Sequence, residues 1–190
     1  MALPAEQLRY SFADALDWDE DERYEIIDGD IYMMSSPLTV HQRISIELAT
    51  QLHTFLRGKR CEAFTAPFDV RPFEKEGDAP EDVDTVLIPD ITVVCDSAKL
   101  DKYGCRGAPD MVIEILSPSS RARDMKTKYR IYQRAGVREY WIVDPEIKIV
   151  NVFLLEDGQY NAPASYTAKA RAPVSLWEGF SVDLSLVFGE

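Results

Sequence analysis

The spacing of apolar residues divides the chain into short strand-like runs separated by polar turns. Nearly continuous apolar runs at 87–95 and 111–116 are typical of strands at the centre of a sheet, where both faces are covered. Further strand-like runs cover 63–71, 139–143 and 147–154. The pattern predicts an α/β or α+β fold with a central β-sheet.

Two longer segments have the apolar spacing of amphipathic helices. In residues 39–56 apolar side chains recur mostly four positions apart, and Gly58 supplies a stop. Residues 121–135 follow a Ser-Pro-Ser-Ser turn that can cap a helix, and Gly136 can end it. We therefore expect a central mixed β-sheet flanked by helices.

A β-hairpin is predicted near the N-terminus. Asp28-Gly29 separates two short apolar runs, 24–27 and 30–34, and Asp-Gly is a strong signal for a two-residue turn. Residues 74–84 are acidic and contain Gly and Pro, so we expect an exposed loop there. Residues 175–184 should add a short strand and a closing segment. No linker divides the chain, so we expect one domain over residues 1–190.

Composition narrows the class of protein. The 190 residues are 46% hydrophobic, enough for one ordinary core. No apolar run is long enough for a membrane span, and the N-terminus lacks the basic and apolar parts of a signal peptide. Three cysteines, Cys61, Cys95 and Cys105, are an odd number without CxxC spacing. We therefore expect neither a disulfide framework nor a cysteine-zinc site, and a reducing cytoplasm fits better.

Charge is distributed unevenly along the chain. The net charge of −12 argues against nucleic acid as a partner. Residues 121–138, however, hold seven Arg and Lys against Asp124, a local charge of +6. This segment could direct a basic surface at phosphates, and we expect its phosphate contacts to come from Arg121, Arg123, Lys126 and Arg130. The alternative is a solvated helix face beside an acidic neighbour such as a second subunit.

Two carboxylates interrupt the apolar runs. Asp90 and Glu114 lie in predicted adjacent strands, where an ionised carboxylate is costly unless it is paired or binds a metal. On the following helix Asp124, Lys128 and Tyr132 share one face, so Lys128 could reach both carboxylates. Mg²⁺ prefers carboxylate oxygens, and a nearby lysine can orient the attacking water or stabilise developing charge. The set predicts a metal site for phosphodiester chemistry.

Each of these residues also has a purely structural interpretation. Asp90 could cap a loop, and Glu114 could form a buried ion pair with an arginine such as Arg121. Glu25 in the hairpin and His41 near a helix start are possible auxiliary residues, although turns and helix caps also favour them. Asp124 is expected to cap or pair along its helix, and the aromatic residues Tyr132, Tyr140 and Trp141 are expected in the core.

Linked motifs resemble those of a known family. They are Pro89-Asp90, Ala108-Pro109-Asp110, Glu114-Ile115-Leu116-Ser117-Pro118, the Asp124, Lys128 and Tyr132 face, and the run from Glu139 to Pro145. Together they resemble the Uma-two family of restriction-endonuclease-like bacterial proteins over about residues 20–155, the expected core of the domain. The resemblance implies a nuclease fold of the PD-(D/E)XK type, in which Asp90 and Glu114 bind Mg²⁺ or Mn²⁺. Leu116 stands where that motif has lysine, and Lys128 is the natural substitute.

Two functions from different classes follow. One is a Mg²⁺-dependent endonuclease acting on DNA, with Asp90 and Glu114 holding the metal and Lys128 aligning the water. The other is a catalytically silent nuclease-fold module that binds nucleic acid or protein, favoured by Leu116 and the negative net charge. A glycosidase-like use of the carboxylates is a distant third, because it does not call for a basic helix. A homodimer would suit a two-strand cut.

Overall fold

A computed structural model of the chain describes residues 9–18 and 23–189. Its central sheet has the strand order β10-β9-β8-β7-β5-β3, and β11 also pairs with β9. The strands are β3 (Glu62–Thr65), β5 (Ile91–Val94), β7 (Met111–Ile115), β8 (Glu139–Asp144), β9 (Ile149–Glu156), β10 (Gln159–Tyr160) and β11 (Ala164–Thr167). β7 and β8 are parallel, whereas the other described pairs of this sheet are antiparallel. The sheet is therefore mixed, as predicted.

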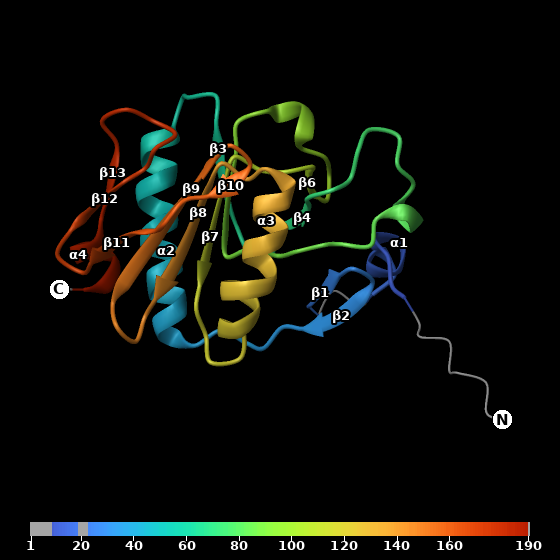
Figure 1. The fold of residues 1–190 in the computed structure, drawn as a ribbon, viewed down its shortest axis with the longest axis horizontal. Coiled ribbons are helices and arrows are strands. Elements are labelled where there is room, and N and C mark those ends of the chain that lie inside the picture. Colours follow the sequence, from blue (N-terminus) through green and yellow to red (C-terminus); the bar gives the residue numbers. More distant parts are fainter. Residues whose placement is uncertain (1–8, 19–22, 190) are drawn as a thin grey trace.

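Helices cover both faces of this sheet (Figure 1). α2 (Thr39–Leu56) lies on one face, and the helical segment made of η3 (Arg123–Lys128) and α3 (Tyr129–Ala135) lies on the other. Side chains in β7 and directly after it point alternately towards the two faces of the sheet. Ile113 and Ile115 pack in the core that contains the buried face of α2. Val112 and Leu116 pack in the core beneath α3.

The predicted N-terminal hairpin consists of β1 (Tyr24–Ile27) and β2 (Asp30–Met33). Asp28 and Gly29 both have positive φ, 48° and 82°, as the favoured two-residue hairpin turn requires. Ile26 of β1 pairs with Val86 through backbone hydrogen bonds of 2.8 Å in each direction. This contact places β1 beside the segment that leads into β5.

Smaller elements surround the central sheet. β4 (Asp69–Arg71) pairs with β6 (Gly104–Arg106), and β12 (Arg171–Pro173) pairs with β13 (Ser181–Asp183). The others are α1 (Phe12–Leu16), η1 (Pro80–Asp82), η2 (Ser97–Lys99) and α4 (Leu184–Phe188). Buried residues of the C-terminal elements, such as Val182 and Leu184, join the core beneath α2. No helix in the described ranges is long and apolar enough to span a membrane.

Three predicted elements differ from those observed. The strand expected over 63–71 is two strands, β3 and β4, which belong to different sheets. The strand expected over 87–95 begins at Ile91, because the preceding segment pairs outside the central sheet, for example Leu87 with Val70. The helix expected over 121–135 is present, but Arg123–Lys128 is π-helical.

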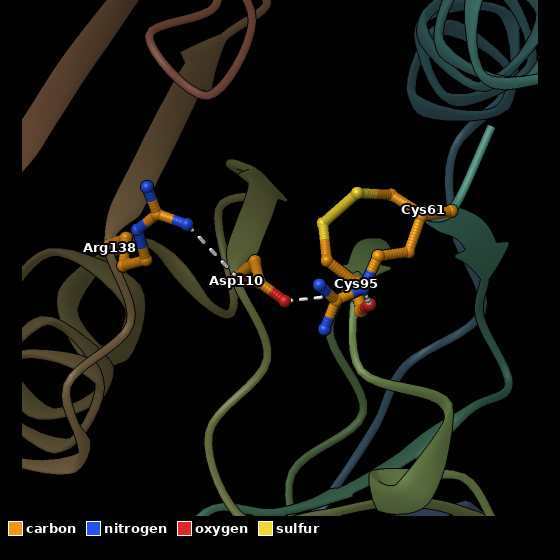
Figure 2. The surroundings of a disulfide bond; sticks show 5 residues. Cys61, Cys95, Asp110 and Arg138 are labelled. Carbon is orange, nitrogen blue, oxygen red and sulfur yellow. Dashed lines mark hydrogen bonds and ion pairs between the residues drawn. A yellow bond between two sulfur atoms is a disulfide. The ribbon is translucent and has the colours of Figure 1, made fainter.

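A disulfide between Cys61 and Cys95 contradicts the expectation that the cysteines remain unpaired (Figure 2). Glu62 pairs with Val94, so Cys61 and Cys95 lie opposite each other one position further along the two strands. Their separation of 34 residues in the sequence gives no sign of this proximity. The third cysteine, Cys105, is free and buried. The disulfide joins β3 to β5 at one end of the strand pair.

The disulfide predicts a measurable contribution to stability. Replacing Cys61 and Cys95 together by alanine should lower the free energy of unfolding by about 3–4 kcal/mol, since a cross-link that closes a loop of this length restricts the unfolded chain. Urea denaturation of both proteins measures the difference. Reductant should destabilise the parent and leave the double variant unchanged. Equal stability of the oxidised parent and the variant would contradict the prediction.

Candidate functional site

A cleft of about 910 Å³ contains the sequence-predicted candidates for catalysis. Its walls come from α2, from the segment after β2 and from the loop after β7. The polar side chains at its base are Glu25, His41, Asp90, Glu114, Asp124 and Lys128. Residues between 25 and 128 are thus brought to one place by the sheet and by the helices on its two faces.

The register of β5 and β7 brings the two strand-borne carboxylates together. Ile91 pairs with Ile113, and continuing this antiparallel register by one position places Asp90 opposite Glu114. Oδ2 of Asp90 accepts a hydrogen bond of 2.7 Å from the backbone N–H of Ile115. Nε2 of His41, in the first turns of α2, lies 3.1 Å from Oδ1 of Asp90. Asp90 is therefore fixed by contacts from β7 and from α2.

The ammonium group of Lys128 lies among three carboxylates. Its Nζ is 2.7 Å from Oε1 of Glu25, 2.9 Å from Oε1 of Glu114 and 3.4 Å from Oδ1 of Asp124. The hydroxyl of Tyr132 also donates to Oε1 of Glu114, over 2.7 Å. The helix-borne lysine thus reaches Glu114, one of the two carboxylates that the sequence predicted, whereas the contacts of Asp90 are with His41 and Ile115. Glu25, expected as an auxiliary residue, contacts the lysine directly.

The π-helical segment supplies two of these groups. Asp124 and Lys128 both belong to this segment, and their side chains are buried. The hydroxyl of Tyr140 donates a hydrogen bond of 3.0 Å to the backbone carbonyl of Asp124. The neighbouring Arg123 lies 3.5 Å from Oε2 of Glu25, and its guanidinium is 4.5 Å from the ring of Tyr32. Single π-helical turns occur often at functional sites.

Burial and charge act against each other at the base of the cleft. Burial raises the pKa of Glu114 well above its usual range, and Lys128 opposes this rise. Burial also raises the pKa of Asp124. For Lys128, burial by itself would lower the pKa, but Glu114, Glu25 and Asp124 together raise it well above its usual range. Lys128 therefore keeps its proton at neutral pH.

His41 is a second titrating group of the cleft. Burial alone would lower the pKa of its imidazole, but the hydrogen bond to Asp90 and the charge of that carboxylate raise it above its ordinary value. The raised pKa favours a charged imidazolium beside Asp90. His41 thus contributes a polar contact to the cleft, and its role as an auxiliary residue stays a prediction.

The donor set is compatible with a hard divalent cation. In the described part of the chain, no three His, Cys, Asp or Glu side chains form a ready-made metal cluster. Mg²⁺, however, often uses one or two carboxylates and completes its shell with waters and substrate phosphate. Oδ1 of Asp124 is buried and accepts no hydrogen bond from the described residues. It shares the ammonium of Lys128, 3.4 Å away, with Glu25 and Glu114, so the negative charge of this site is incompletely compensated. Asp90 and Glu114, opposite each other in the register, fit the requirement.

The four predicted phosphate-binding residues lie in different surroundings. Arg121 pairs with Asp144 at 2.7 Å and with Glu146 at 3.0 Å, so the alternative in which it pairs with Glu114 is wrong. Arg123 faces the cleft beside Glu25. Lys126 and Arg130 are exposed and form no ion pair with the described residues.

Two members of the site were expected to have structural roles. Asp124 was expected to cap or pair along its helix, and it does pair with Lys128, but inside the cleft. Tyr132 is fully buried, as a core residue should be, yet its hydroxyl contacts Glu114. The shared face of Asp124, Lys128 and Tyr132 was the sequence signal that could have joined them to the site.

Comparison with known proteins agrees with this fold and its motifs. The crystal structure of a "putative nuclease belonging to DUF820" from Anabaena variabilis covers 95% of this chain and 98% of its own, with 20% identity and a TM-score of 0.74. A similarity of this extent shows that the two chains share a fold, here a central mixed sheet flanked by helices. The uncharacterized protein slr1290 of Synechocystis is 27% identical over 173 residues, 89% of this chain and 87% of that protein.

The family assignment follows from a match over most of the chain. The model of the Uma2 family, described as "Putative restriction endonuclease", matches residues 12–186. The chain belongs to this family.

The buried lysine predicts a pH-dependent change in stability. Lys128→Met should lower the free energy of unfolding by about 3–5 kcal/mol, because it leaves Glu25, Glu114 and Asp124 together without the ammonium group. The raised pKa values of Glu114 and Asp124 mean that the folded state binds protons above pH ~4, where unfolded carboxyl groups have lost them. Stability should therefore fall as pH rises, and more steeply in the variant.

Urea denaturation of the variant and the parent at about pH 5.5 and about pH 8 tests whether the free energy of unfolding falls with rising pH in this way. The variant should lose less stability, relative to the parent, at the lower pH. A loss that is equal at both pH values, or larger at the lower one, would show that the carboxylates do not depend on Lys128 for charge compensation.

Proposed function

We propose that this protein is a metal-dependent nuclease that hydrolyses phosphodiester bonds of nucleic acid, most naturally an endonuclease acting on DNA. The observation that carries the proposal is the convergence of Asp90, Glu114 and Lys128 at the base of one cleft. Membership of a family described as "Putative restriction endonuclease" supports the same reaction class. Fold similarity alone would not establish it.

Asp90 and Glu114 would hold a Mg²⁺ or Mn²⁺ ion through carboxylate oxygens. When bound, such an ion supplies a Lewis acid that polarises the phosphoryl group and positions the attacking water. Tyr132 and Lys128 both donate to Oε1 of Glu114 and so fix the orientation of this carboxylate. His41 does the same for Asp90 through Oδ1.

Lys128 acts in this proposal as a fixed positive charge. Its raised pKa keeps it protonated, so it is unsuited to remove a proton from water at neutral pH. It is suited to stabilise negative charge that develops on the phosphoryl oxygens. Glu25 assists by positioning the ammonium, to which its Oε1 lies closer than that of Glu114. Of the four basic residues predicted to contact phosphates, Arg123 lies in the cleft wall, and Lys126 and Arg130 are exposed outside it.

Cleavage of supercoiled plasmid in the presence of Mg²⁺ or Mn²⁺ tests the reaction. Asp90→Asn and Glu114→Gln should abolish nicking, since each removes a ligand of the metal ion. Lys128→Met should reduce nicking about 10²-fold or more, since it removes the positive charge that acts on the phosphoryl group. Glu178→Gln, an exposed carboxylate outside the cleft, is the matched control and should cut like the parent. No cutting by the parent with either metal would favour the catalytically silent module instead.

Metal binding can be measured separately from catalysis. Isothermal titration of the parent with Mn²⁺ should detect a site, and Asp90→Asn should remove it because a neutral amide is a much weaker ligand for a hard cation. Glu178→Gln should retain it. Binding that persists in Asp90→Asn would move the metal away from the predicted ligands, and the absence of binding to the parent would count against the whole proposal.

A further inference from the structure

The carboxylates of the candidate site lie deep in the cleft. Glu25, Glu114 and Asp124 expose 1%, 3% and 1% of their surface, and the side chain of Asp90 exposes 15%. A phosphate that reacts there must leave the surface of the protein and descend into the cleft. Duplex DNA is stiff over about 150 base pairs, so one of its phosphates cannot descend without local melting or bending. A single strand can follow such a path.

Two serine side chains that line the cleft contact each other across two of its walls. Oγ of Ser35, in the segment after β2, and Oγ of Ser119, in the loop after β7, are 3.0 Å apart and share a hydrogen bond. Both residues line the cleft and are exposed. This hydrogen bond joins walls that are 84 residues apart in the sequence.

The surface charges that would hold a duplex are largely compensated. Affinity for duplex DNA comes mainly from many Lys and Arg contacts with phosphates. In the basic segment, however, Arg121 pairs with Asp144, Arg134 with Asp28 and Arg138 with Asp110. Within the cleft, the arginines that line the walls are Arg23, Arg57 and Arg123. Three positive charges are enough to contact a short stretch of phosphates.

The walls also offer apolar surface that a duplex would leave uncovered. Met33, Leu38 and Ile46 line the cleft although 73%, 58% and 67% of their surface is exposed. Unpaired bases present apolar faces and free hydrogen-bonding edges, whereas paired bases keep their faces stacked inside the duplex. The exposed serine hydroxyls that line the cleft can bond to such edges.

We infer that the cleft receives a single strand of nucleic acid, such as an unpaired end or loop, and not a continuous duplex. This inference rests on the proposed nuclease function, whose reaction it restricts to unpaired substrate. The apolar wall covers the bases, while the arginines of the cleft meet the few phosphates that approach Asp90 and Glu114.

Fluorescence anisotropy with a labelled oligonucleotide of about 15 nucleotides and its blunt duplex tests the inference. Ca²⁺ replaces Mg²⁺ so that binding is measured without cutting. The single strand should bind the parent at least about tenfold more tightly than the duplex, because it alone presents unpaired bases to the cleft. Equal or tighter binding of the duplex, or no binding of the single strand, would overturn the inference.

Two variants that each add one negative charge distinguish binding in the cleft from a general electrostatic effect of the protein's charge. Ile46→Asp places a carboxylate in the cleft wall, and Ile147→Asp places one on a side chain that is 62% exposed and lies outside the cleft. Ile46→Asp should weaken binding of the single strand about tenfold or more, whereas Ile147→Asp should leave it unchanged. Equal weakening by the two would overturn the assignment of the cleft.

The outcomes also separate this inference from the nuclease function. Metal-dependent nicking together with a preference for duplex would refute the single-strand inference and leave the nuclease intact. If the protein prefers the single strand but cuts no substrate, the proposed nuclease function is refuted and the inference that the cleft binds a single strand stands.

Discussion

The structure around the cleft depends on one buried ammonium group. Glu25 from the hairpin, Glu114 from the centre of the sheet and Asp124 from the π-helical turn all lie within 3.4 Å of Nζ of Lys128. Three buried carboxylates would repel one another without it, and desolvation would oppose the charge of each. One contact therefore joins the hairpin, the sheet and the helix. The same contact holds the residues of the proposed reaction, so stability and chemistry share a residue.

The sequence predicted elements whose signals are local. Residues 39–56 form a helix with the predicted bounds, and Asp28-Gly29 turns the hairpin where expected. In both cases a few neighbouring residues decide the conformation, through apolar spacing or through positive φ. The spacing of Asp124, Lys128 and Tyr132 along their helix also predicted the face from which Lys128 meets Glu114.

Features that depend on distant partners were not predicted. The pairing of Cys61 with Cys95 follows from the register of β3 and β5, which apolar patterns do not specify. The break between β3 and β4 likewise reflects pairing with different strands. The basic segment shows the same limit, because a count of charges does not reveal that Arg138 faces Asp110 or that Arg121 faces Asp144. The charges of one sequence segment predict the surface charge poorly when acidic residues from other segments of the chain pair with them.

The covalent link between Cys61 and Cys95 has a consequence for how the protein behaves among other copies of itself. β3 ends the described strand order, so its outer side offers backbone groups that could pair with another chain. A disulfide across β3 and β5 keeps this edge strand from separating from the sheet. The link lies at Cys95, whereas Asp90 lies at the other end of β5. The covalent attachment of the edge strand is thereby located away from the cleft.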